Sequence, residues 1–182
     1  GARMPFSSRL AQFIDTINEH VGRAVLWLVL AVTLISAANA VARYALGLSS
    51  NAWLEIQWYL FAAIFLLGAG YTLKHNGHVR IDIVYGHLSE RAQAWIDLAG
   101  TLLFLLPLTL LMVALSWPGF VESWARGELS PDAGGMVRWP VRLLIPLGFA
   151  LLALQGVSEA IKRIAFLRGA GTLSRERPPE ER

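Results

Sequence analysis

The chain has 182 residues, of which 55% are hydrophobic and only 16% are charged, and its formal net charge is +3. About a quarter of the residues of a typical soluble domain are charged, so this composition argues against a soluble enzyme. The sequence contains no cysteine, which excludes disulfide and thiolate chemistry.

Residues 8–20 are predicted to form an amphipathic helix. Apolar residues recur at helical spacing between positions 10 and 21, and polar residues fill most of the other positions. Such a helix would lie on the membrane surface or pack against a neighbouring helix. A simple cytosolic extension of the first membrane span explains the same pattern equally well.

Four uncharged runs predict four membrane spans. They comprise residues 24–42, 56–73, 98–121 and 143–158. About 20 mostly apolar residues cross the hydrocarbon core of a bilayer, and the fourth run reaches that length when its flanking charges point toward the headgroups. We therefore predict an all-α fold, a single membrane domain of residues 1–182 with spans at about 21–43, 53–73, 97–121 and 141–160.

The predicted spans contain signals for close packing and for one distortion. Small residues at 36–38 and 68–70 would let helix backbones approach one another, and Asn39 would hydrogen-bond either within the bundle or to a partner. Pro107 predicts a kink or a local rearrangement in the third span. Most tryptophans fall at predicted span ends, as in the aromatic belts of membrane proteins: Trp53, Trp95, Trp117, Trp124 and Trp139.

Two longer connections join the second span to the third and the third to the fourth. Residues after Lys74 are predicted to form a helix along the cytosolic interface, because a lone strand there would leave its backbone groups unpaired. Arg80 and Asp82 are two apart, so on a helix each would need a partner elsewhere. The loop 122–142 is rich in glycine and proline and is predicted to be exterior, and residues 169–182 are predicted to form a flexible cytosolic tail.

The distribution of lysine and arginine predicts the orientation. The termini and the connection between the second and third spans hold 12 of these residues, and the other two connections hold 4. The positive-inside rule then places both termini in the cytoplasm. The positive net charge thus reflects the orientation of the chain in the membrane, and nucleic-acid binding is a poor explanation of it.

The titratable residues form no recognisable catalytic, cofactor or metal site. His75 and His78 are three apart, but further ligands with the spacing of a zinc site are missing. None of the four histidines lies within a predicted span, which argues against haem ligation there. The uncharged runs also lack the carboxylate that a self-sufficient small transporter would use for coupling. These patterns favour a non-enzymatic membrane subunit.

Several short motifs resemble, in their order and spacing, those of a known family. They are Asn39-x-x-x-Arg43-Tyr44, Trp53-x-Glu55, Gly-Ala-Gly-Tyr at 68–71 and His-Val-Arg-Ile-Asp at 78–82. Over about residues 20–165 the chain resembles the small permease (DctQ-type) subunits of TRAP transporters, the tripartite ATP-independent periplasmic systems. The resemblance implies an inner-membrane scaffold for a large permease subunit that also helps to receive a periplasmic substrate-binding protein. It further implies that the partner subunit uses a sodium gradient to take up an organic acid, and that this chain needs no cofactor.

The candidate contact residues come from both sides of the predicted membrane. They are Asn39, Arg43, Glu55, Arg80, Asp82, Glu128 and Asp132. Arg43 and Glu55 flank the short first connection, where they would either pair with each other or point separately toward the headgroups. Two other functions are considered. A stand-alone homodimeric exporter would lack its coupling carboxylate, and a membrane anchor of a redox complex would lack its histidines.

Overall fold

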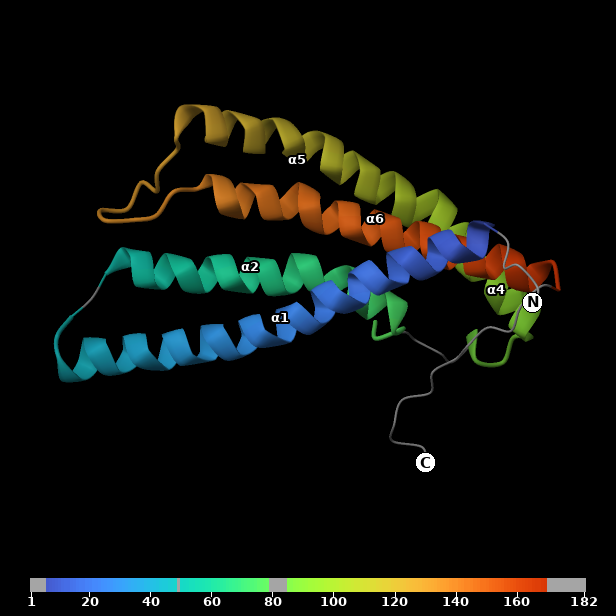
Figure 1. Ribbon diagram of the computed structural model, residues 1–182, viewed down its shortest axis with the longest axis horizontal. Helices are drawn as coiled ribbons and strands as arrows, with labels where there is room; N and C mark the ends of the chain where they lie inside the picture. The colour runs from blue at the N-terminus through green and yellow to red at the C-terminus, as the bar shows by residue number, and fades with distance from the viewer. Residues whose placement is uncertain (1–5, 49, 79–84, 170–182) are drawn as a thin grey trace.

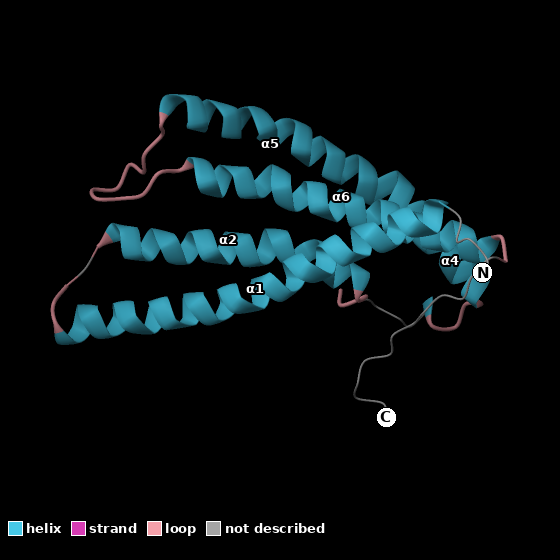
Figure 2. Cartoon of the chain, in the orientation of Figure 1, coloured by secondary structure: helices cyan, strands magenta, loops and turns pink. Residues whose placement is uncertain are grey.

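A computed structural model describes residues 6–48, 50–78 and 85–169, and these are almost entirely helical (Figures 1 and 2). The elements are α1 (Phe6–Ala45), α2 (Asn51–Lys74), α4 (Glu90–Gly100), the π-helix η1 (Thr101–Leu105), α5 (Leu106–Arg126) and α6 (Trp139–Leu167). Within the described ranges there is no β-strand, and one isolated β-bridge joins Leu129 to Val137. The predicted all-α fold is confirmed.

Four helical segments are long and apolar enough to cross a membrane. They are Ser8–Ala45, Asn51–Lys74, Glu90–Arg126 and Trp139–Leu167. The third consists of α4, η1 and α5 in direct succession. The four predicted spans are therefore confirmed, and the chain is a multi-pass membrane protein.

The spanning helices lie side by side in the order α5, α6, α2, α1 (Figure 1). α2 packs on both α1 and α6, and α5 packs on α6. Near its N-terminal end α1 runs past α2 and also contacts α6, and α4 packs on α6 in the same region. The arrangement is thus an open array, tied together at the end of the molecule where α1 begins and α6 ends.

The N-terminal segment is not a separate helix. α1 runs without a break for 40 residues, or about 60 Å, which is roughly twice the thickness of a hydrocarbon core. The extension of the first span is therefore the arrangement found. Its buried face also differs from the apolar stripe in the sequence, since Ala11, Ile14 and Asn18 are buried whereas Phe13 is 64% exposed.

Pro107, the first of two prolines in the third span, lies at the expected local rearrangement. Pro107 has no backbone N–H, so it cannot complete the hydrogen bond that an α-helix would form with the carbonyl four residues earlier. The π-helix η1 lies directly before it, where one turn is widened and the helix then continues as α5.

Glycines set the closest approaches between helices. At Gly148 of α6, an added Cβ would lie 2.8 Å from the carbonyl oxygen of Leu66 in α2. At Gly22 of α1, an added Cβ would lie 2.1 Å from the ring of Tyr71. These contacts let α2 lie tightly against both of its neighbours.

Several predicted features lie outside the described residues. These are Arg80, Asp82 and most of the predicted interfacial helix, together with all but the first residue of the predicted tail. Their predicted roles therefore stay predictions, as does the orientation of the chain.

Cysteine labelling will test the orientation, because the native chain has no cysteine to interfere. A membrane-impermeant maleimide applied to intact spheroplasts should label Ala133→Cys, at the exposed end of the α5–α6 connection, and should not label Arg168→Cys. Arg168 is a better inner reporter than Asn76, whose φ of 51° would strain a cysteine. Labelling of Arg168→Cys without labelling of Ala133→Cys would show that the chain has the opposite orientation.

Candidate functional site

Five charged side chains form an ionic cluster where α1, α4 and α6 meet. They are Asp15, Asp97, Glu159, Lys162 and Arg163. The Lys162 ammonium donates to Asp15 at 2.9 Å and to Glu159 at 2.6 Å, and Arg163 donates to Glu159 at 2.6 Å and to Asp97 at 3.1 Å. The cluster therefore forms one continuous chain of charges across three helices.

Neutral donors complete the cluster. Gln155 donates to Asp15 at 2.9 Å, and the Ser158 hydroxyl donates to the same carboxylate at 2.6 Å. The Tyr85 hydroxyl donates to Asp97 at 2.8 Å. Each carboxylate thus accepts from at least two side chains, as a partly buried charge requires.

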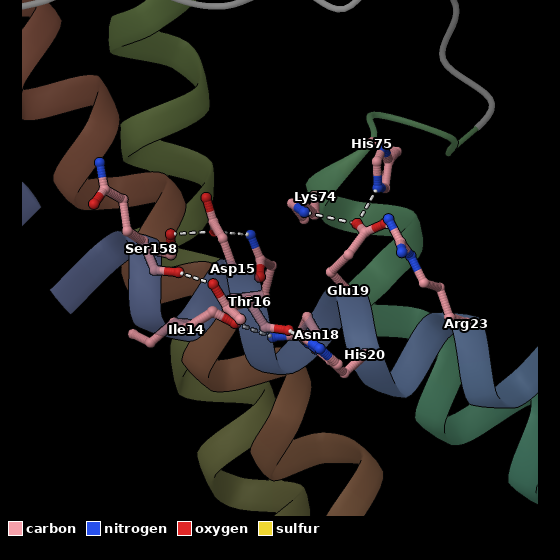
Figure 3. A network of polar contacts seen from close by, with 12 residues as sticks. Ile14, Asp15, Thr16, Asn18, Glu19, His20, Arg23, Lys74, His75 and Ser158 are labelled. Carbon is pink, nitrogen blue, oxygen red and sulfur yellow. Dashed lines mark hydrogen bonds and ion pairs between the residues drawn. The ribbon is translucent and has the colours of Figure 1, made fainter. Parts of the chain in front are cut away.

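A second group of charges ties α1 to the end of α2. Glu19 lies between Lys74 and His75, at 2.7 and 2.9 Å, and also pairs with the exposed Arg23 at 3.1 Å (Figure 3). His75 is therefore a partner of Glu19. In the described part of the chain, no group of three or more histidine, cysteine or acidic residues is arranged to hold a metal ion.

The crossing of α1 over α2 and α6 encloses a buried amide. Asn18 is completely buried, and its side-chain oxygen occupies the space where a Cβ of Gly70 would otherwise lie. The sequence suggested the stretch 68–70 as a close-packing face, and Gly70 has that role, with a polar side chain against it. The arrangement is one of helix packing, and it contains no catalytic geometry.

At the opposite end of the molecule, residues 128–138 form a short hairpin between α5 and α6, here called the α5–α6 hairpin. The Ser130 N–H donates to the Met136 carbonyl, and the Arg138 N–H donates to the Glu128 carbonyl, both at 2.9 Å. The indole rings of Trp124 and Trp139 meet edge to face at its base, with centroids 4.5 Å apart. Backbone hydrogen bonds and the contact of the two indoles therefore hold this connection together.

Three side chains of α2 hold this hairpin. Asn51, Glu55 and Tyr59 are spaced four residues apart and so lie on one face of the helix. Asn51 donates to the Ala133 carbonyl and Tyr59 to the Val137 carbonyl, each at 2.9 Å. Between them the Glu55 carboxylate, only 4% exposed, accepts from the Met136 N–H at 2.6 Å and from the Ser130 hydroxyl.

Of the two arrangements considered for Arg43 and Glu55, the structure does not contain the pairing. Both oxygens of Glu55 are used by the α5–α6 hairpin, whose backbone N–H at Met136 needs an acceptor. Asn39 and Arg43 instead line a small cavity with residues at the start of α2. The proximity of two charges across a short loop therefore did not predict an ion pair, because the hairpin occupies the carboxylate of Glu55.

The two predicted contact residues of the hairpin differ in availability. Glu128 accepts from Arg142 at 2.8 Å, so its carboxylate is already engaged within the chain. Asp132 is exposed in the turn. The polar residues of α2 at 51, 55 and 59 were the signal that could have revealed the attachment of the hairpin, since they recur on one side of an otherwise apolar helix.

Comparison with known proteins identifies close parallels in one group of transporters. A family model described as "Tripartite ATP-independent periplasmic transporters, DctQ component" matches residues 19–166. The ectoine TRAP transporter small permease protein TeaB of Halomonas elongata is 27% identical over 152 residues, which cover 83% of this chain and 78% of that protein.

Two further relatives match shorter stretches. The C4-dicarboxylate TRAP transporter small permease protein DctQ of Pseudomonas aeruginosa is 29% identical over 113 residues, or 62% of this chain and 53% of that protein. Its namesake in Vibrio cholerae is 31% identical over 77 residues, or 42% of this chain and 32% of that protein. No solved structure matches the chain.

Replacing Lys162 should weaken the fold more than replacing an exposed cation. Lys162→Met leaves Asp15 and Glu159 without their shared ammonium, which should lower the free energy of unfolding by about 1–3 kcal/mol. Arg23→Met, which removes an exposed partner of Glu19, should change it by about 0.5 kcal/mol or less. Unfolding in mixed micelles would measure both, and a loss in Lys162→Met no larger than that in Arg23→Met would contradict the predicted contribution of the cluster.

The attachment of the hairpin to α2 should depend on Glu55. Glu55→Gln replaces a carboxylate that accepts two hydrogen bonds with a neutral amide, and should cost about 1–3 kcal/mol. Limited proteolysis should then cut residues 128–138 faster than in the wild type. Glu122→Gln, which alters an exposed ion pair with Arg126 nearby, should leave the cleavage rate unchanged. Unaltered cleavage in Glu55→Gln would contradict the proposed anchoring.

Proposed function

Because the chain belongs to the DctQ component family of the tripartite ATP-independent periplasmic transporters, we propose that it scaffolds a large permease subunit in the inner membrane. It also helps to receive a periplasmic substrate-binding protein. The permease partner carries out the transport, which is the sodium-coupled uptake of an organic acid.

The observation that carries the scaffold role is the openness of the helix array. Only 11% of the most apolar stretch of each of the first three spanning segments is buried within the chain. Helices of a self-contained bundle would bury a continuous face against one another. The exposed apolar surface here can be covered by lipid on one side and by a larger membrane protein on another.

The uncharged centres of the spans support a division of labour between subunits. A self-sufficient small ion-coupled transporter would carry an ionisable residue at bilayer depth, and no charged residue lies within 24–42, 56–73, 98–121 or 143–158. The charges of the described residues lie at the two ends, where they bond within the chain or face the aqueous phases. Ion coupling is therefore assigned to the partner.

The α5–α6 hairpin is the part of the chain that we assign to docking of the binding protein. It is ordered, it extends beyond the helices, and it exposes Asp132 in its turn. Glu128 is committed to Arg142, so Asp132 is the more available of the two acids. On the opposite side of the membrane, Arg80 and Asp82 stay predicted contacts of the permease.

The substrate class rests on the family resemblance. The names of two relatives specify ectoine and C4-dicarboxylates, at 27% and 29% identity. Similarity of the small subunit thus does not choose between these compounds, and the uptake of organic acids is the more general proposal.

Reconstitution in proteoliposomes will test this function. The chain alone should accumulate no dicarboxylate or other organic acid under an inward sodium gradient. It should co-purify with the large permease, and the two together with the binding protein should give uptake that stops when the gradient is dissipated. Robust transport by the chain alone would favour the exporter and reject the scaffold role.

The docking surface can be tested in the same assay. Asp132→Lys should alter the apparent affinity for the binding protein and its dependence on salt, since rim charges act mainly on association. Glu122→Lys serves as the control, because Glu122 lies on α5 outside the hairpin. Identical kinetics in both variants would place the docking surface elsewhere.

A further inference from the structure

The motif Asn39-x-x-x-Arg43-Tyr44 takes no part in the ionic cluster or in the hairpin. Asn39 and Arg43 are four residues apart, so they lie on one face of α1. Together with Ser50, Asn51 and Leu54 they line a cavity of about 70 Å³ between the end of α1 and the start of α2. The cavity is thus a separate polar feature of the molecule.

The cavity contains a positive charge and unused hydrogen-bond donors. The guanidinium of Arg43 has five N–H groups and no acceptor, and no acid among the described residues forms an ion pair with it. Neither Asn39 nor Ser50 makes a side-chain hydrogen bond within the described part of the chain, and Ser50 does not cap α2. Asn51 donates outward, to the hairpin. The unused hydrogen-bond donors and the positive charge favour the binding of an oxyanion.

The depth of the cavity specifies where that oxyanion comes from. The uncharged run 24–42 contains 19 residues, which as a helix span about 28 Å, close to the thickness of the hydrocarbon core. Arg43 follows this run directly, at the level where lipid phosphates lie. This placement holds for either orientation of the chain in the membrane.

Exposed apolar side chains beside the cavity also fit a lipid. On the membrane side of Arg43, Val41 of α1 and Trp53 near the start of α2 are 64% and 50% exposed. An arginine next to such side chains is favoured where acyl chains cover the apolar groups and a phosphate meets the guanidinium.

We propose that this cavity binds the phosphate of a phospholipid headgroup. Arg43 is its main ligand, Asn39 and Ser50 supply further donors, and the acyl chains lie along the exposed apolar side chains of α1. The site is distinct from the transporter role, since it needs neither the permease nor the binding protein.

Native mass spectrometry of the full chain, purified in detergent, will test the proposal with phosphatidylglycerol as the probe. Arg43→Gln should weaken binding about tenfold or more, because it removes charge-assisted hydrogen bonds to the phosphate. Asn39→Ala should weaken it less, and Arg43→Lys should retain part of the affinity. Arg126→Gln is the matched control: this arginine lies at the same end of the molecule, is exposed and pairs with Glu122, so lipid binding should not change.

Two competitors distinguish the sources of phosphate. Diacylglycerol with the same acyl chains should not compete, and inorganic phosphate should compete only weakly. Competition by inorganic phosphate as strong as that by the lipid would assign the cavity to the free ion and overturn the proposal. Circular dichroism would confirm helix content, and if Arg43→Gln does not fold, Asn39→Ala and Ser50→Ala provide the test.

Two other results would also overturn the lipid site. One is equal phosphatidylglycerol affinity in the wild type and in Arg43→Gln. The other is loss of association with the permease in Arg43→Gln while lipid affinity stays unchanged, which would assign Arg43 to a carboxylate of that partner.

Discussion

The ion pair between Lys162 and Asp15 fixes the point at which α1 crosses α6, and the ionic cluster around it also holds α4. Glu159, Lys162 and Arg163 follow one another at i, i+3 and i+4, so one acid supports two cations on the same face of α6. Lys162 then reaches α1 and Arg163 reaches α4. Because a partly buried carboxylate without a partner costs free energy, the three helices cannot separate here without leaving charges unpaired.

At the opposite end hydrogen bonds attach α2 to the hairpin, and an ion pair joins Glu128 of the hairpin to Arg142 of α6. There α2 holds the α5–α6 hairpin through Asn51, Glu55 and Tyr59, and so ties α2 to the connection between two other helices. In the middle of the molecule the contacts are glycines and apolar side chains, with a hydrogen bond from Ser36 to Gln57 between α1 and α2. Polar contacts at both ends therefore set the geometry, while the centre leaves wide apolar surfaces exposed.

The sequence predicted those features of the fold that depend on the composition of a single segment. The uncharged runs located the spans, and Pro107 located the π-helix, because each is a local consequence of chain chemistry. Asp15 and Lys162 are 147 residues apart, and no periodicity links such a pair. The sequence left the continuity of α1 open, since an amphipathic surface helix and an extension of a span have the same pattern of residues.

The openness of the array has a consequence for its stability. Helices that bury little surface against one another gain little from packing, so the fold relies on its two polar ends and on whatever covers its faces. A partner or a lipid that binds only the folded array adds its binding free energy to that fold. Such a chain keeps a defined geometry at its two polar ends, even though its central apolar faces need lipid or protein to cover them. The hairpin is held at one end and the ionic cluster at the other. The apolar faces between them are therefore available for contacts with lipid and with the proposed permease partner.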